Sequence, residues 1–167
     1  KAGTNGTGTD LTQSFTYGAT ASLKDATAAL TRTGYSITGW STTDASAQTH
    51  ALNASYSTNA NLILYPVWNI NTYRVTFDSP KATVTELIVD YIYASPALTL
   101  PSRTRANYVL QGWYSAATGG TKIGIATASY TPTASITLYA QWVQETLNGI
   151  EASKLTFAGD IRASATQ

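Results

Sequence analysis

The side chains that could carry acid–base chemistry in this chain of 167 residues are few and scattered. The one histidine, His50, lies in a Ser/Thr-rich stretch with no cysteine and no acidic partner nearby. A histidine that acts as a general base needs a positioned partner to orient its ring and tune its pKa. No Gly-x-Ser-x-Gly nucleophile motif accompanies it. The sequence therefore predicts no catalytic residue, and we expect that the chain is not an enzyme.

The carboxylates and glycines do not form a metal or cofactor pattern either. Asp and Glu together number nine, and none are spaced as in a calcium-binding loop. Absence of cysteine excludes a thiolate zinc site and a disulfide framework. The glycine clusters near residues 3–8 and 119–120 precede no helix pattern, which a phosphate-binding loop requires, so they are interpreted as turns. We expect no metal and no cofactor.

Aromatic residues are the remaining candidates for contact with a ligand. The chain has eleven tyrosines and four tryptophans, and exposed rings of this kind stack on sugars. Tyr91, Tyr93 and Tyr114 are the candidates for an exposed ligand contact. The tryptophans recur at corresponding places in a repeat, which predicts a core role for all of them: Trp40, Trp68, Trp113 and Trp142.

An internal duplication positions these tryptophans. Residues 31–40 read Thr-Arg-Thr-Gly-Tyr-Ser-Ile-Thr-Gly-Trp, and residues 104–113 read Thr-Arg-Ala-Asn-Tyr-Val-Leu-Gln-Gly-Trp, 73 positions later. Residues 61–68 similarly return as residues 135–142, 74 positions later. Two landmarks with almost the same offset indicate a duplicated structural unit of about 70 residues. Such a small unit depends on large aromatics for its core.

Composition favours an exported β protein. Charged residues make up 11 % of the chain, against about 25 % in average proteins, and Ser and Thr are abundant. The net charge of +1 comes from scattered residues, so no basic patch for nucleic acid is predicted. No apolar run reaches the roughly 18 residues that a membrane span needs, and we expect no membrane insertion.

Short strands dominate the predicted structure. Residues 14–17, 36–40 and 73–77 alternate apolar and polar side chains, which is typical of strands with one buried face. A short helix or helical turn is expected only at residues 22–30, where Ser22 and Asp25 have capping-box spacing. The four residues 69–72 link the units and contain neither Gly nor Pro, so we expect limited freedom between the modules.

These residues resemble the Listeria–Bacteroides repeat, also called the internalin B-repeat. Residues 73–78 (Tyr-Arg-Val-Thr-Phe-Asp), 112–114 (Gly-Trp-Tyr) and 137–142 (Thr-Leu-Tyr-Ala-Gln-Trp) match its pattern closely, as do residues 17–18 and 31–40 in the first unit. The resemblance covers residues 1–143 and implies a small, mainly β, β-grasp-like module. Such modules occur in tandem in large bacterial surface proteins, and no catalysis is associated with them.

Three departures from the pattern carry expectations. Pro66 lacks a backbone donor, so its strand is expected at a sheet edge or bulged there. Asn107 replaces the counterpart of Gly34, and Asn is the residue that best tolerates a left-handed backbone. Pro80 and Lys81 stand where the pattern has a Gly-rich turn, so that turn must differ from the one in unit one.

The two ends of the chain carry a fourth expectation. Residues 1–6 read as the turn after a first strand, so the first module is expected to lack its opening strand. Residues 153–158 (Ser-Lys-Leu-Thr-Phe-Ala) match the opening strand of the second module in pattern. This tail either opens a following domain or pairs with unit one of a neighbouring molecule by strand addition. We expect a first module at 1–69, a second at 73–143 and an extension at 144–167, and a longer parent protein.

The function implied is a structural or adhesive stalk segment of a large extracellular protein at the bacterial cell surface or cell wall, acting as an adhesin spacer without catalysis. Its expected partners are neighbouring repeats of the same polypeptide. Two alternatives stay open, namely a module that binds a glycan or a host protein through exposed tyrosines, and a subunit that self-associates through strand 153–158. An enzyme accessory domain is a third class.

Overall fold

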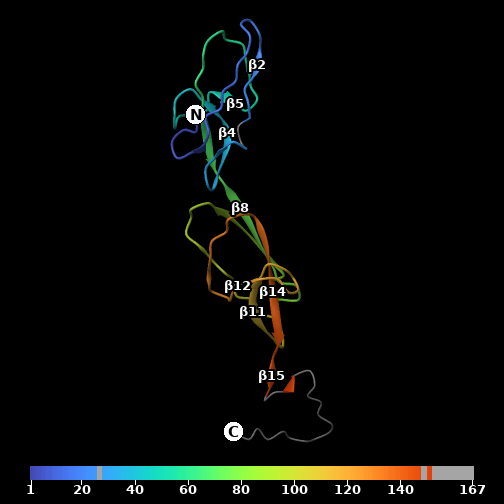
Figure 1. Cartoon of the computed structure of the whole chain (residues 1–167). Coiled ribbons are helices and arrows are strands. Elements are labelled where there is room, and N and C mark those ends of the chain that lie inside the picture. Colours follow the sequence, from blue (N-terminus) through green and yellow to red (C-terminus); the bar gives the residue numbers. More distant parts are fainter. Residues whose placement is uncertain (26–27, 148–149, 152–167) are drawn as a thin grey trace, which may run out of the picture. The chain divides into compact units, whose positions relative to one another are not determined.

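The computed structural model describes residues 1–25, 28–147 and 150–151, and all of the described structure is strand, turn or loop (Figure 1). The mainly β prediction is thus confirmed. The chain forms two compact units. Unit 1 comprises Lys1–Tyr73 with Ile92–Ser95, and unit 2 comprises Arg74–Tyr91 with Pro96–Gln167.

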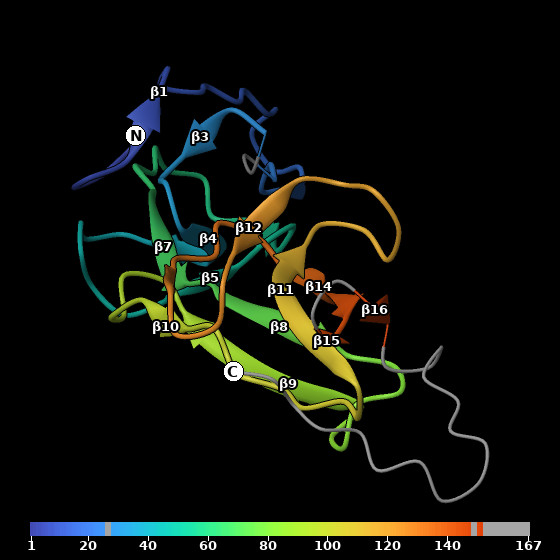
Figure 2. The ribbon, with the colours of Figure 1, turned by 90° about the horizontal axis from the view of Figure 1, so that it is seen from below.

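Unit 2 is built around a five-stranded sheet of order β12-β11-β14-β8-β9. Its strands are β8 (Thr72–Asp78), β9 (Glu86–Ile92), β11 (Tyr108–Tyr114), β12 (Lys122–Gly124) and β14 (Ile136–Gln144). Strand β14 runs parallel to β8 on one side and antiparallel to β11 on the other. Figure 2 shows β8 and β9 side by side. Two small antiparallel pairs complete the unit: β10 (Leu98–Thr99) with β13 (Ser129–Tyr130), and β15 (Thr146–Leu147) with β16 (Ile150–Glu151).

Strand β8 is central to the core of unit 2. Its alternating pattern places Val75 and Phe77 on one face, and both are fully buried. They pack with Leu100, Leu138 and Trp113, whose ring meets that of Phe77 edge-on at 5.0 Å between centroids. An edge-to-face aromatic pair of this kind contributes about 0.5–1.5 kcal/mol beyond the burial of its area.

Unit 1 has a smaller sheet of three strands, ordered β5-β4-β7. They are β4 (Tyr35–Ser41), β5 (His50–Ala51) and β7 (Tyr65–Ile70). Two further pairs are β1 (Thr7–Gly8) with β3 (Leu30–Thr31), and β2 (Ala21–Ser22) with β6 (Ser55–Tyr56). Pro66 lies in β7, an edge strand, which confirms the expectation for a residue without a backbone donor.

Local details are duplicated along with the sequence. Strand β4 pairs with β7 as β11 pairs with β14, and the register shifts between Ile37 and Gly39 and between Leu110 and Gly112, at the same place in both repeats. Gly34 has a φ of 76° and Asn107 a φ of 64°, so the expected left-handed backbone at Asn107 is confirmed.

Two local predictions in unit 1 are wrong. The helix expected at residues 22–30 is absent from its described residues, because Ser22 belongs to β2, Leu30 to β3, and the amide of Leu23 bonds to the carbonyl of Ala54. A segment this short cannot offset helix nucleation against such sheet contacts. The strand expected at residues 14–17 is also absent. Strand 153–158 lies outside the described residues.

Candidate functional site

The duplicated Thr-Arg-x-x-Tyr motif forms a turn rather than a ligand site. The amide of Tyr35 donates to the carbonyl of Arg32 at 3.0 Å, and that of Tyr108 to Arg105 at 3.1 Å. In each turn the guanidinium stacks over the tyrosine ring, at 3.7 Å for Arg32 and 3.5 Å for Arg105. The same cation–π contact in both repeats gives this motif a structural explanation.

The three candidate tyrosines are not gathered on one surface. Tyr91 is only 2 % exposed, so the expectation that it is exposed is wrong. It lies two residues beyond Val89 on β9 and therefore shares the inward face of that strand. Tyr93 is half-buried edge-on against Tyr35, with 6.1 Å between centroids. Tyr114 is half-buried with the ammonium of Lys122 6.0 Å from its ring centre.

All four tryptophans lie in or against the two apolar cores. Trp113 is fully buried and its Nε1 donates to the carbonyl of Pro101 at 2.8 Å. Trp40 is 5 % exposed, and its buried Nε1 has no hydrogen-bond partner in the described structure. Trp68 and Trp142 are partly buried and pack against the core of their own unit.

The contacts of His50 with neighbouring residues give it a structural role. Its Nδ1 lies 2.9 Å from the hydroxyl of Thr49, and its ring meets Tyr56 edge-on. Within the described residues, no three His, Cys, Asp or Glu side chains are grouped so that they could hold a metal ion. Nor does that part of the chain contain a helix long and apolar enough to cross a membrane.

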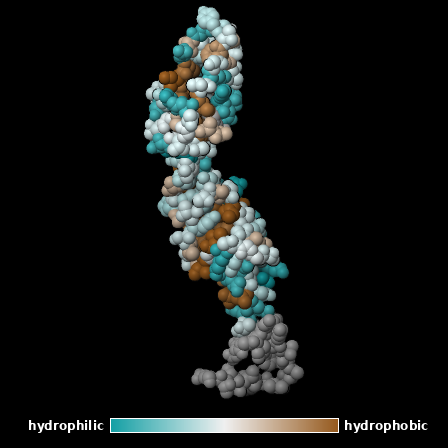
Figure 3. Space-filling view, viewed as in Figure 1, coloured by the Kyte–Doolittle hydropathy of each residue, from teal (hydrophilic) through white to brown (hydrophobic). Residues whose placement is uncertain are grey.

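An apolar groove with a volume of about 370 Å³ lies in unit 1. The residues that line it include 10–13, Phe15, 60–64, Leu23, Leu30 and Trp40. Figure 3 shows hydrophobic residues reaching the surface of this unit. We call this recess the unit 1 groove.

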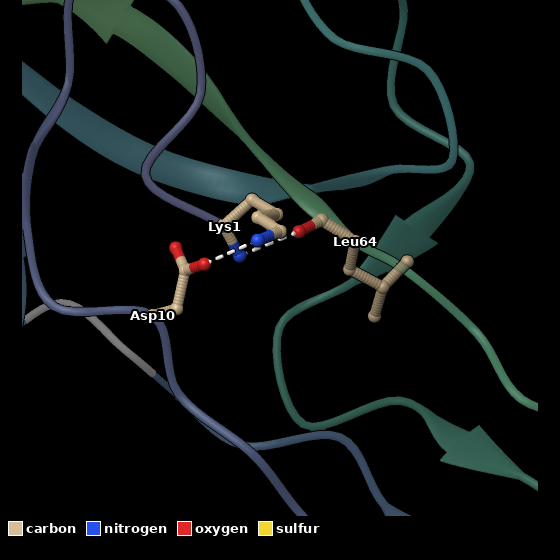
Figure 4. A network of polar contacts seen from close by, with 3 residues as sticks. All are labelled: Lys1, Asp10 and Leu64. Atoms are coloured by element: carbon tan, nitrogen blue, oxygen red, sulfur yellow. Dashed lines mark hydrogen bonds and ion pairs between the residues drawn. The ribbon is translucent and has the colours of Figure 1, made fainter.

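Lys1 links two residues that line the unit 1 groove, Asp10 and Leu64 (Figure 4). Its α-ammonium donates to the carbonyl of Leu64 at 3.1 Å, and its Nζ pairs with the carboxylate of Asp10. The hydrogen bond from Lys1 holds the pKa of Asp10 below its ordinary value. Both partners are solvent-exposed, so this pair adds little stability.

Sequence reasoning missed the unit 1 groove although a signal was present. It treated residues 14–18 as a strand and turn of their own, and it did not recognise residues 10–18 as a repeat of residues 86–94. Tyr17 and Tyr93 correspond at an offset of 76, and Gly18 and Ala94 both have positive φ, 80° and 62°. The groove is therefore lined on one side by the counterpart of β9.

The fold and the duplicated turns define the chain as a tandem pair of small, all-β repeat modules with a packed aromatic core. The model of the Listeria–Bacteroides repeat domain matches it twice, at residues 3–67 and 73–141. The chain therefore belongs to the Listeria–Bacteroides repeat family, whose modules are typical of bacterial surface or secreted proteins.

A curated relative supports this assignment. Internalin H of Listeria monocytogenes serovar 1/2a is 35 % identical over an alignment of 136 residues, and the match covers 78 % of this chain. The matched region is only 23 % of that relative, so the chain corresponds to less than a quarter of its length.

Proposed function

We propose that this chain is a structural and adhesive spacer segment of an extracellular protein at the bacterial cell surface, with no catalytic role. Each β-grasp-like unit is one element of a stalk whose partners are the neighbouring repeats of the same polypeptide. The observation that carries the proposal is the duplication itself, since the motif residues recur as turn and core residues in both units.

The chemistry of the described residues supports a mechanical role. Both repeats contain the Arg–Tyr turn and the register shift. These shared features maintain a fold rather than a reactive centre. The ligand-binding alternative is weakened because Tyr91 is buried in the core. The other two candidates, Tyr93 and Tyr114, are half-buried against other side chains. The spacer role is therefore favoured over recognition of a glycan or a host protein.

A glycan array combined with a panel of host extracellular-matrix proteins tests the spacer role. The labelled chain is expected to give no saturable signal on either. A saturable signal that is lost in Tyr114→Ala but kept in Tyr130→Phe would contradict the spacer role and establish a binding module. Tyr130 lies on β13 and serves as the control because phenylalanine preserves its ring.

A further inference from the structure

A recess of about 520 Å³ lies in unit 2 and is lined in part by Pro80 and Lys81, two of the residues that depart from the family pattern. The other lining residues are Arg105, residues 117–119 and residues 140–142 of β14, and all of them belong to unit 2. We call this recess the unit 2 recess. Neither Lys81 nor Arg105 forms an ion pair with a described residue. The recess therefore has two cations and no carboxylate in its lining.

Hydrogen bonds and stacking fix the segments that carry these cations. The amide of Thr83 donates to the carbonyl of Thr104 at 3.0 Å, which joins the turn of Lys81 to the residue before Arg105. The guanidinium of Arg105 stacks on the tyrosine of its own motif. Nε2 of Gln141 donates to two carbonyls of the loop at residues 115–121, at 2.6 and 3.1 Å. A frame that is already ordered lowers the cost of binding a ligand.

The turn that contains Lys81 has an exact counterpart in unit 1. Thr7 Oγ1 lies 2.9 Å from Thr31 Oγ1, and Thr83 Oγ1 lies 3.2 Å from Thr104 Oγ1. Thr7 thus corresponds to Thr83, and the residues three positions before each of them correspond as well.

Unit 1 fills the equivalent place with a carboxylate of its own. Thr4 corresponds to Pro80, and its amide and hydroxyl donate to the carboxylate of Asp44, at 3.0 and 2.8 Å. The amide of Ala45 donates to the same carboxylate at 2.9 Å. Asp44 lies in the loop after β4, and the loop at residues 115–121 after β11 is its counterpart. That counterpart contains no acidic residue.

Unit 2 has therefore lost the carboxylate and gained a cation beside its place. Pro80 has neither an amide hydrogen nor a hydroxyl, so it cannot hold a carboxylate as Thr4 does. Lys81 stands where unit 1 has Asn5, and the two residues have similar positive φ, 68° and 61°. The backbone of the turn is the same in both units, while the side chain has become an ammonium.

We propose that the unit 2 recess binds the carboxylate of an aspartate or glutamate side chain from an acidic segment of a partner protein. Lys81 donates a charge-assisted hydrogen bond to it, and Arg105 donates from the edge of its guanidinium, which stacking on a ring leaves accessible. A protein carboxylate is favoured over other anions because Asp44 shows that a short side chain on a backbone loop fits this place. This binding goes beyond the spacer role and does not depend on it.

Titration of this chain with a capped oligoglutamate peptide, followed by amide NMR, tests the proposal. Saturable shifts are expected at residues 80–82, 105 and 117–119, and an oligoglutamine peptide of the same length is expected to cause none. Lys81→Gln is expected to raise the dissociation constant roughly three- to tenfold, because one charge-assisted hydrogen bond is lost. Lys122→Gln removes a cation of β12 outside the recess and is expected to leave the constant unchanged.

A second pair of variants tests the recess without removing a cation. Thr118→Asp places a carboxylate in the loop that lacks one, and it is expected to weaken peptide binding at least as much as Lys81→Gln. Thr118→Asn has the same shape without the charge and is expected to bind as the unchanged chain does. Thr118 is exposed, so neither variant disturbs a core. Amide spectra that change only near the recess show that each variant is folded.

Four results would overturn the proposal. The first is the absence of saturable shifts, and the second is equal weakening by Lys81→Gln and Lys122→Gln, which would show attraction to any positive charge. The third is binding that Thr118→Asp leaves intact. The fourth is tighter binding of an oligogalacturonate than of the oligoglutamate peptide, which would assign the recess to an acidic polysaccharide instead of a protein.

Discussion

Phe15 in unit 1 and Tyr91 in unit 2 occupy the same place in the two repeats, yet Phe15 is 38 % exposed and Tyr91 is 2 % exposed. The segments that carry them differ in the same way, because residues 86–92 form β9 and residues 10–16 form no strand. What separates them is β8, which pairs with β9 and has no counterpart among the described strands of unit 1. One central strand therefore decides whether its neighbours are ordered as a sheet and whether their aromatics are buried.

The largest expected effect on stability comes from removing the main core side chain of β8. Phe77→Ala is expected to cost unit 2 about 3–5 kcal/mol of unfolding free energy, the usual range for a buried phenylalanine. Urea unfolding followed by unit-resolved hydrogen exchange measures it. Thr76→Ala, on the other face of β8, is the control. A loss below about 1 kcal/mol would mean that Phe77 does not organise this core.

The equivalent tryptophans of the two repeats, Trp40 and Trp113, should differ by a smaller amount in unfolding free energy. Trp113→Phe removes the hydrogen bond to the carbonyl of Pro101, whereas Trp40→Phe removes a buried N–H that has no partner among the described residues. The cost in unit 2 should therefore exceed the cost in unit 1 by about 1 kcal/mol. The same unfolding measurement compares the two variants, and equal costs would contradict the hydrogen-bond explanation.

Removing the arginine of the duplicated turn should cost the two units the same unfolding free energy. Arg32→Ala and Arg105→Ala each remove a guanidinium stacked on a tyrosine, and each should cost about 0.5–1 kcal/mol. The lysine variants at both positions are expected to keep part of this energy. A loss confined to one unit would show that the duplicated turn has two different roles.

The smallest effect is a pH dependence found in unit 1. Asp44 accepts hydrogen bonds from the amide of Thr4, at 3.0 Å, and from its hydroxyl, at 2.8 Å, which lower the pKa of Asp44. Its folded pKa lies below the unfolded value, so its contribution is present above the unfolded value and is lost as the pH falls through the folded one. Asp44→Asn should flatten the loss of thermal stability below about pH 4. An unchanged pH profile would contradict this assignment.

The sequence predicted the features that depend on local chemistry. The alternation of residues 73–77 predicted β8, Pro66 predicted an edge, and Asn107 predicted a left-handed turn. Each of these follows from the residue itself and its immediate neighbours. The family was equally visible, because the motif residues maintain turns and cores that any member must form.

The failures all depend on distant strands. The alternation of residues 14–17 is that of a strand, but no strand among the described residues pairs with it. Residues 22–30 were assigned by helix capping, while the sheet contact between Leu23 and Ala54 decides their structure. Tyr91 was expected to be exposed and is buried. Its inward orientation depends on the pairing of β9 with β8, which the residues around Tyr91 do not reveal.

Amide hydrogen exchange in residues 62–65 and 136–139, measured on this chain of 167 residues at low concentration, tests the comparison most directly. These segments are equivalent in sequence, but only the second pairs with β8. Exchange in 62–65 should be faster by orders of magnitude, because its amides lack the strand partner that protects 136–139. Equal protection in the two segments would contradict the open groove in unit 1, and with it the account of how the two repeats differ.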